Sequence, residues 1–440
     1  MAVTESCSVQ LLKGDMVFRA YIGLMWFFAP GQDVTEALAT LQRGVDAIVA
    51  HVPALAGSVQ GGRVQCGSVQ GGHVQCGSVQ GGSVAYVPGD SVQVQHDCVG
   101  VTFAEVAAAN FDQNQFPDLF SRAPCADQEQ APALVVQLTS LKCGALRLMI
   151  NCHHSLGDAR AVSLVAKHIS GACDSLGRYT VSPALWTSRP ALQAMLDNCP
   201  LASTAPPVSE IGDCISRRPY SELSAMGDMR DFQVHLPSES LQQLKYLLGE
   251  STNNAVMALF WRAWARALVQ HGSTCPWVYS GGPMDVSGQI GNGCSNTYLG
   301  NLIVPRPMRL DRSFVLDQSL AEVAAAIRQK FQKTKQTAAA QQFLNGQQAG
   351  EDQRISALGQ TDSPMLAFSN MTRMEPPLHS LSFGMTKPLS VQLRSFGAPF
   401  MVFAMADGHN GILANTTLPN SIAHVLAKDP EFNQYANFKY

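Results

Sequence analysis

The sequence is poor in charge and has no long apolar run. Charged residues make up 14% of the 440 residues, against 46% hydrophobic ones, and the net charge is −3. A chain with no positive excess has no electrostatic basis for binding nucleic acid or an anionic membrane surface. The longest apolar candidate, residues 21–30, is about half as long as a membrane span and is typical of a buried strand.

Several motifs of other activities are also missing. The twelve cysteines include no C-x-x-C pair, and the N-terminus lacks the basic and apolar segments of a secretory signal. We therefore expect a reduced, cytoplasmic compartment and no metal site. The glycine-rich loop 288–293 matches neither phosphate-binding nor dinucleotide-binding patterns. Without a G-x-S-x-G motif, hydrolysis would have to use Cys143, a remote alternative because that cysteine lies within a predicted strand.

The length predicts two or three domains, and the composition suggests where two of them meet. Residues 181–219 are rich in proline and lack sustained periodicity. We interpret 181–230 as a crossover linker between an N-terminal domain, 1–180, and a C-terminal domain, 231–440.

A ten-residue repeat lies inside the first of these domains. Residues 57–66, 67–76 and 77–86 read GSVQGGRVQC, GSVQGGHVQC and GSVQGGSVAY. Each unit places Gly-Gly between two short β-prone runs, which is typical of a hairpin. We expect a tandemly duplicated hairpin that extends from the surface, since a metal or ligand array would need more than His73 and two cysteines.

Apolar periodicity predicts the regular elements on either side of the linker. Helical spacing occurs over 34–50 and 251–268, and alternation typical of strands occurs over 91–106 and 133–151. Ser251 or Thr252 could cap the long second helix.

A histidine and an aspartate occupy the turn between a predicted strand and a predicted helix. The strand pattern ends near Asn151, and the helical period begins after Asp158. None of the ten histidines other than His154 has an aspartate four residues later. An imidazole at a strand end is held rigidly and can face a cleft, and Asp158 could orient it or fix the turn. The alternative is a hydrogen-bonded histidine with no chemical role.

Six stretches, in the same order along the chain, resemble segments of the BAHD acyltransferases, which move an acyl group from coenzyme A to an alcohol or amine. The stretches are PALAG (53–57), VQLTSLKCG (136–144), CHHSLGDA (152–159), TNNAVMALFWRAWARA (252–267), YLGN (298–301) and SFGMTKP (382–388). The resemblance implies a two-domain α/β fold like that of chloramphenicol acetyltransferase. Each domain would be a mixed sheet with flanking helices, and the active-site channel would lie at the interface.

The resemblance also implies the central chemistry. His154, rather than His153, would be the general base, with a pKa near its ordinary value and direct attack without an acyl-enzyme. Asp158 would be structural. Ser369 would donate to the oxyanion, with Asn370 assisting.

By the same resemblance, Ser251 and Thr252 would approach the phosphates of coenzyme A, because a helix start favours anions. The alternative is that they are plain helix caps. Asn370 is a further candidate contact for the coenzyme.

The chain departs from the family pattern at two functional positions. The family's D-x-R segment, whose arginine holds the motif aspartate, reads Asp-Val-Ser at 285–287. Asp158 therefore needs another partner, and Arg160 and Arg306 are candidates. Met371 replaces the family's tryptophan, which loosens the expected acceptor pocket.

These observations predict an acyl-CoA-dependent O-acyltransferase acting on a small-molecule alcohol, with N-acylation of an amine also possible. Acyl-CoA would be a co-substrate, no cofactor would be bound permanently, and the protein would be a cytoplasmic monomer of secondary metabolism. Two alternatives stay open: a non-catalytic descendant that acts as a binding or scaffold protein, and a condensation-type or wax-ester-type transferase, which shares H-H-x-x-x-D.

Overall fold

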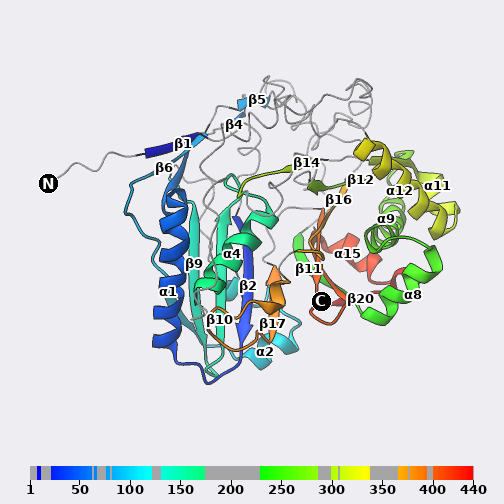
Figure 1. Ribbon diagram of the computed structural model, residues 1–440. Helices are drawn as coiled ribbons and strands as arrows, with labels where there is room; N and C mark the ends of the chain where they lie inside the picture. Colours follow the sequence, from blue (N-terminus) through cyan, green and yellow to red (C-terminus); the bar gives the residue numbers. More distant parts are fainter. Residues whose placement is uncertain are drawn as a thin grey trace.

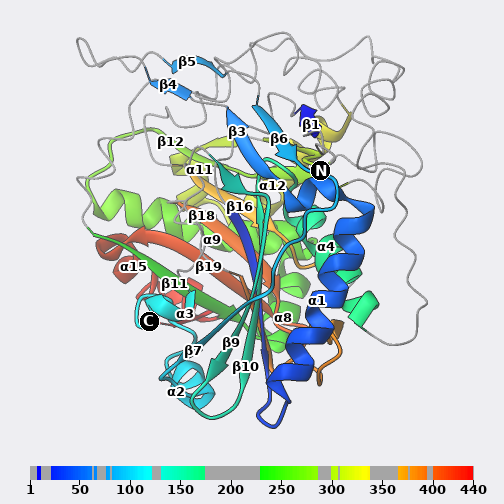
Figure 2. The same ribbon diagram turned by 90° about the vertical axis from the view of Figure 1, so that its left-hand side faces the viewer.

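Two large sheets, each covered by helices, lie side by side in the protein (Figure 1; Figure 2). The computed structural model describes residues 7–10, 21–61, 64–66, 76–79, 82–120, 130–173, 228–285, 299–305, 308–336, 365–374, 377–393 and 400–439. The predicted linker lies almost entirely outside the described residues, as do the glycine-rich loop and Arg306. The domain boundaries therefore stay a prediction.

The first sheet combines strands from both ends of the sequence. In the described chain its order is β17 (Ser390–Leu393), β2 (Tyr21–Phe28), β10 (Leu146–His153), β9 (Leu134–Leu141) and β7 (Gln95–Val99). Neighbours are antiparallel except for β7 and β9, which are parallel. Since β17 comes from the C-terminal third, that part of the chain supplies an edge strand to the N-terminal sheet.

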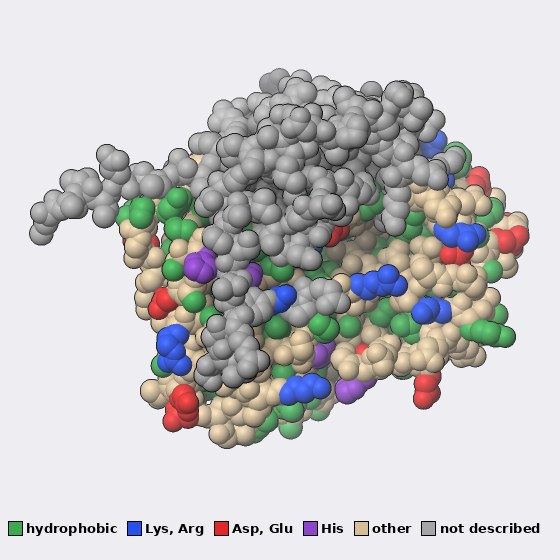
Figure 3. Space-filling view, in the orientation of Figure 1, with side chains coloured by type: hydrophobic (Ala, Val, Ile, Leu, Met, Phe, Trp, Pro, Cys, Tyr) green, Lys and Arg blue, Asp and Glu red, His purple; other side chains and the backbone are tan. Residues whose placement is uncertain are grey.

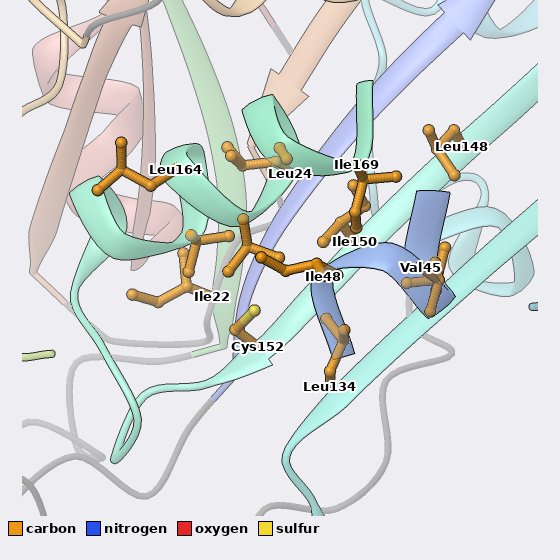
Figure 4. Packing of buried hydrophobic residues seen from close by; sticks show 14 of the residues in the cluster. Ile22, Leu24, Val45, Ile48, Leu134, Leu148, Ile150, Cys152, Leu164 and Ile169 are labelled. Atoms are coloured by element: carbon orange, nitrogen blue, oxygen red, sulfur yellow. The ribbon is translucent and has the colours of Figure 1, made fainter. Parts of the chain in front are cut away.

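Two long helices, α1 (Val34–His51) and α4 (Ala159–Cys173), cover one face of this sheet. Asp33 begins α1 by accepting hydrogen bonds from the backbone N–H groups of Thr35 and Glu36. Side chains of the helices and strands interdigitate in one apolar layer (Figure 4). Its labelled members are Ile22, Leu24, Val45, Ile48, Leu134, Leu148, Ile150, Cys152, Leu164 and Ile169.

The other face of the sheet is covered at one end by α2 (Phe103–Ala108) and α3 (Pro117–Phe120). The strand predicted over 91–106 is therefore wrong in its second half. The side chain of Thr102 accepts from the backbone N–H of Glu105, whose carboxylate accepts from the backbone N–H of Thr102. This capping box satisfies backbone donors that a helix start leaves open, and so it ends the strand.

The second sheet has the order β15 (Met308–Asp311), β12 (Trp277–Gly281), β16 (Leu366–Asn370), β18 (Met401–Ala406), β19 (Ile412–Pro419), β11 (Met229–Leu236) and β20 (Asn437–Lys439) in the described residues. The predicted long helix is α9 (Thr252–Gln270), which packs on one face and is buried along most of its length. Around α9 lie α8 (Ser238–Leu248), α11 (Arg312–Asp317), α12 (Leu320–Gln336), α15 (Asn420–Leu426) and α16 (Pro430–Asn433).

In the described residues of the repeat, the first and third units pair with each other instead of each folding into its own hairpin. Strand β3 (Ser58–Gly61) pairs with β6 (Gly82–Tyr86), and β4 (Val64–Cys66) pairs with β5 (Cys76–Val79). The hairpins predicted for the first and third units are therefore wrong, and the second unit lies almost entirely outside the described residues. The strand register favours this pairing. Strand β3 also pairs with β8 (Ala131–Pro132), and β6 also pairs with β1 (Cys7–Gln10), and the pairing of β4 with β5 continues that of β3 with β6.

A segment of the C-terminal third crosses to the N-terminal sheet before β17. Trp26 Nε1 donates to the carbonyl of Leu378 in η5 (Leu378–Ser380) at 2.9 Å, and its ring lies 4.9 Å from that of Phe383. Gly384 has φ +75°, and a Cβ there would lie 2.7 Å from Thr40 Cγ2. The stretch 382–388 therefore acts as a structural anchor.

The described surface shows no single-sign block of charge in one view, where acidic and basic side chains are scattered (Figure 3). None of the helices in the described ranges has both the length and the apolar composition needed to cross a membrane.

Candidate active site

The turn after β10 separates its two histidines by environment. His153 is fully buried, its Nδ1 accepts from the backbone N–H of Ser155 at 3.2 Å, and its ring meets the Tyr21 ring edge-on at 5.2 Å. His154 comes directly after the last strand residue and is partly exposed. Of the two imidazoles, that of His154 is the more exposed.

The surroundings of His154 keep its imidazole neutral. Burial lowers the pKa of His154 to about 4, although hydrogen bonds involving its own backbone and Asn301 act in the opposite direction. The expectation of an ordinary pKa is therefore wrong, because the ring loses most of its hydration. Asn301 Nδ2 also donates to the carbonyl of His154 at 2.8 Å, which fixes the turn from the opposite side.

Asp158 fixes the turn and ties it to a distant segment. Its side chain is almost fully buried. One carboxylate oxygen accepts from the backbone N–H of Ala161 at 3.0 Å, inside the first turn of α4, and the other accepts from the backbone N–H of Leu302 at 3.1 Å. Burial raises the pKa of Asp158, while the charge of Arg160 and the two N–H groups lower it. Of the two roles considered for Asp158, the structure shows the one that fixes the turn.

Gly157 allows the close approach that this geometry needs. A Cβ at this position would lie 2.4 Å from the Cβ of Ala161 and 3.7 Å from the backbone nitrogen of Gly300. A side chain here would clash with Ala161 in the first turn of α4, whereas its contact with Gly300 would be an ordinary one.

Arg160 has a different role from the one expected. Its Nε lies 3.7 Å from Asp285 Oδ2, so its ion pair is with the remnant of the D-x-R segment. Asp285 ends β13 (Pro283–Asp285), which pairs with β14 (Ile303–Pro305) directly after Leu302. The direct contacts of Asp158 are backbone amides, and Arg160 acts on it through charge.

Ser369 lies on the second sheet, on the face that packs toward the N-terminal half. Its neighbour Phe368 points to α9, so alternation places Ser369 on the opposite face, where its strand partner is Phe403. Phe403 and Met371 belong to the same buried apolar cluster as Leu156 of the histidine turn. Ser369 is 8% exposed.

The three residues considered for coenzyme A are brought together at the start of α9. Ser251 is the helix cap, and its hydroxyl accepts from the backbone N–H of Asn254 at 3.3 Å. Asn370 Nδ2 donates to Asn253 Oδ1 at 2.9 Å, which joins the end of β16 to the first turn of α9 that Thr252 opens.

Sequence reasoning missed the contribution of Asn301 and Leu302. Both follow the start of the YLGN stretch, and one holds the carbonyl of His154 while the other holds the carboxylate of Asp158. The signal was present, because YLGN was one of the matching stretches, but it carried no assigned contact. Tyr298 lies outside the described residues.

Comparison with known proteins identifies the chain. The sequence profile of the Transferase family matches residues 4–433, which is nearly the whole chain. The chain belongs to this family. The resemblance of this transferase to the BAHD acyltransferases, inferred from its motifs, is confirmed. No curated protein matches its sequence.

Solved structures share the fold of this transferase at low identity. TRI101 of F. sporotrichioides, crystallised with coenzyme A and T-2, has a TM-score of 0.78 and 16% identity, covering 99% of this chain and 100% of that one. Vinorine synthase has a TM-score of 0.69 and 13% identity, covering 99% and 95%. The first condensation domain of the calcium-dependent antibiotic synthetase has a TM-score of 0.61 and 13% identity, covering 95% and 90%. The predicted two-domain α/β fold class is confirmed.

Proposed function

We propose that this transferase moves an acyl group from acyl-CoA to a hydroxyl of a small-molecule acceptor, with His154 as general base. The observation that carries the proposal is the contrast between the two histidines. His153 is buried and its Nδ1 is engaged, whereas His154 is partly exposed and has a pKa well below neutrality. A neutral imidazole at a strand end is the form that can accept a proton.

The neutral form of His154 suits the first half of the reaction, and its low pKa suits the second. At neutral pH the ring is unprotonated, so it can accept the hydroxyl proton as the oxygen attacks the thioester carbonyl. The imidazolium that results is a strong acid in its dehydrated setting, and it returns the proton to the departing coenzyme A thiolate. One carbon–oxygen bond forms, one carbon–sulfur bond breaks, and no acyl-enzyme is needed.

Asp158 and Asn301 position the base and do not contact the reacting atoms. The carboxylate of Asp158 holds the first turn of α4 and the backbone at Leu302, and Asn301 holds the carbonyl of His154. The turn is thereby held between the two halves of the molecule. Such support keeps a base within the small tolerance that proton transfer requires.

Ser369 is the proposed oxyanion donor. Its nearly buried position on the face toward the histidine turn supports this assignment. A hydroxyl that donates to the developing oxyanion in a water-poor setting stabilises the transition state more than the substrate.

Acyl-CoA is the proposed co-substrate, and the start of α9 is its proposed phosphate site. TRI101 structures were determined with coenzyme A and with ethyl coenzyme A, which supports this choice. Ser251, Thr252 and Asn370 lie around the helix N-terminus, whose backbone donors favour anions. The hydroxyl of Ser251 already caps the helix, so Thr252 and backbone N–H groups would supply the contacts.

We also propose a cytoplasmic monomer of secondary metabolism. Free thiols in the described ranges support a reducing compartment; they are Cys98, Cys143, Cys152, Cys173 and Cys275.

A screen of acyl-CoA donors against alcohols and amines, read by mass spectrometry, tests the proposal. Expected products are acceptors heavier by one acyl group, formed together with free coenzyme A. Amine products alone would indicate N-acylation. Free coenzyme A with free acid would indicate hydrolysis and contradict transfer. Tight coenzyme A binding with no product from any pair would favour the non-catalytic alternative.

A further inference from the structure

A polar side chain on β10 lies buried three residues before His154. Ile150 and Cys152 point toward α1 and α4 with the apolar layer, so alternation places Asn151 on the opposite face of the sheet. Its cross-strand neighbours are Gly23 on β2 and Val135 on β9. Gly23 contributes no side chain to the position beside the amide.

Asn151 is unusual in its hydrogen bonding. Its side chain is 0% exposed, and neither its amide oxygen nor its amide nitrogen has a hydrogen-bond partner in the described part of the chain. An asparagine amide offers two donors and an acceptor. Buried polar groups in native proteins are almost always satisfied, so an amide with no partner in the described chain needs one from outside it, such as a water molecule or a ligand.

The same face is where the second sheet joins the first. Gln392 of β17 shares this face with Asn151, because it pairs with Met25, two residues from Gly23. Its amide oxygen accepts from Gln233 of β11 at 2.9 Å, and Gln233 also donates to Asn415 of β19 at 3.1 Å.

Asn415 lies where the two sheets meet and carries a second hydrogen-bond donor without a partner. Its amide nitrogen is buried and has no partner among the residues described. The facing surfaces of the two sheets therefore both carry amide atoms that have no hydrogen-bond partner in the described chain.

We propose that Asn151 binds a second polar group of the acceptor, while His154 acts on the reacting hydroxyl. The inference rests on the proposed acyl transfer and adds a substrate class to it. β10 ends at His153, so three residues of chain join Asn151 to His154 in the turn, and these span at most roughly 10 Å. The acceptor is then a molecule with two hydrogen-bonding groups about that far apart, such as a long diol or hydroxy-ketone, rather than a simple alcohol.

The probes are 1,8-octanediol and 1-octanol with acetyl-CoA. The variant is Asn151→Leu, whose side chain has the same branching with methyl groups in place of the two polar atoms. The wild type should prefer the diol in kcat/KM by roughly tenfold, which is one hydrogen bond to a buried group. Asn151→Leu should lose that preference through a higher KM for the diol, with KM for acetyl-CoA unchanged. Its Tm should equal or exceed that of the wild type, because an open buried amide has been removed.

Thr416→Val is the matched control. The hydroxyl of Thr416 is also buried without a partner in the described residues, but alternation with Ala414 and Leu418 places it on the α9 face of β19. This variant should keep the diol preference of the wild type, and its Tm should equal or exceed that of the wild type.

Three results would overturn the inference. A clearly lower Tm for Asn151→Leu would show that the amide is part of the folded framework. An unchanged diol preference, or no activity toward the diol in a wild type that acylates other acceptors, would show that the amide does not bind the acceptor. A wild type that acylates nothing in the donor–acceptor screen would overturn the proposed function instead.

Discussion

Replacement of Asp158 separates the support of the base from the base itself. Asp158→Ala leaves two backbone N–H groups, those of Ala161 and Leu302, without their carboxylate acceptor. Asp158→Asn keeps one oxygen, which can still cap α4 through Ala161, and loses the other. Asp158→Ala therefore removes both the helix cap and the link to Leu302, whereas Asp158→Asn removes only the link to Leu302.

The structure gives the size of each effect. Loss of a helix cap destabilises a protein by about 0.5–2 kcal/mol, and a buried N–H left unsatisfied by about 1–3 kcal/mol. Because Asp158 is 3% exposed, water replaces the carboxylate poorly. We expect a decrease in the free energy of unfolding of about 3 kcal/mol for Asp158→Ala and about 1–2 kcal/mol for Asp158→Asn.

Urea unfolding followed by circular dichroism measures these differences, and steady-state kinetics measures the effect on catalysis. The kcat should fall by at least roughly tenfold in Asp158→Ala, because the turn that carries His154 loses a support. Affinity for coenzyme A should be unchanged. If Asp158→Ala unfolds within 1 kcal/mol of the wild type and keeps full kcat, the reasoning about this carboxylate is refuted.

Three further predictions follow from neighbouring residues. Arg160→Gln should raise the pKa of Asp158 and Asp285→Asn should lower it, because Arg160 lowers and Asp285 raises that pKa. The acid limb of the kcat/KM profile should therefore move in opposite directions in the two variants. A shift in the same direction in both would contradict this. Between pH 6.5 and 4 the folded protein binds fewer protons at His154 than the unfolded chain, so stability falls as the pH falls, by about 3 kcal/mol over that window. His154→Gln should remove that share of the loss in acid titrations of stability, and an unaltered pH dependence would show the pKa is not lowered. Ser369→Ala should reduce kcat by about 10²–10³-fold with little change in KM, whereas a kcat within threefold of the wild type would exclude an oxyanion role.

Local sequence patterns predicted the framework well. Apolar alternation located β10, and helical spacing located α1, α4 and α9. Of the two residues considered as caps of α9, Ser251 is the cap. The capping box of Thr102 and Glu105 was equally readable, but the alternation before it was extended too far. These features depend on residues close in sequence, so a pattern can reveal them.

Features that depend on distant contacts were not predictable in the same way. The pairing of β3 with β6 is a choice among near-identical repeat units, which a repeated sequence leaves open. The backbone N–H of Leu302, which donates to Asp158, lies 144 residues further along the chain. Because every residue except proline has a backbone N–H, the residue type does not reveal this donor. The low pKa of His154 arises from burial by the whole fold.

The rate of acetyl transfer by His154→Ala, measured as product formed with a productive donor–acceptor pair, tests the central claim most directly. Circular dichroism would first establish that the variant is folded. A rate reduced by about 10²–10⁴-fold, with coenzyme A still bound, is the result expected if this imidazole is the general base. A rate equal to that of the wild type would contradict it.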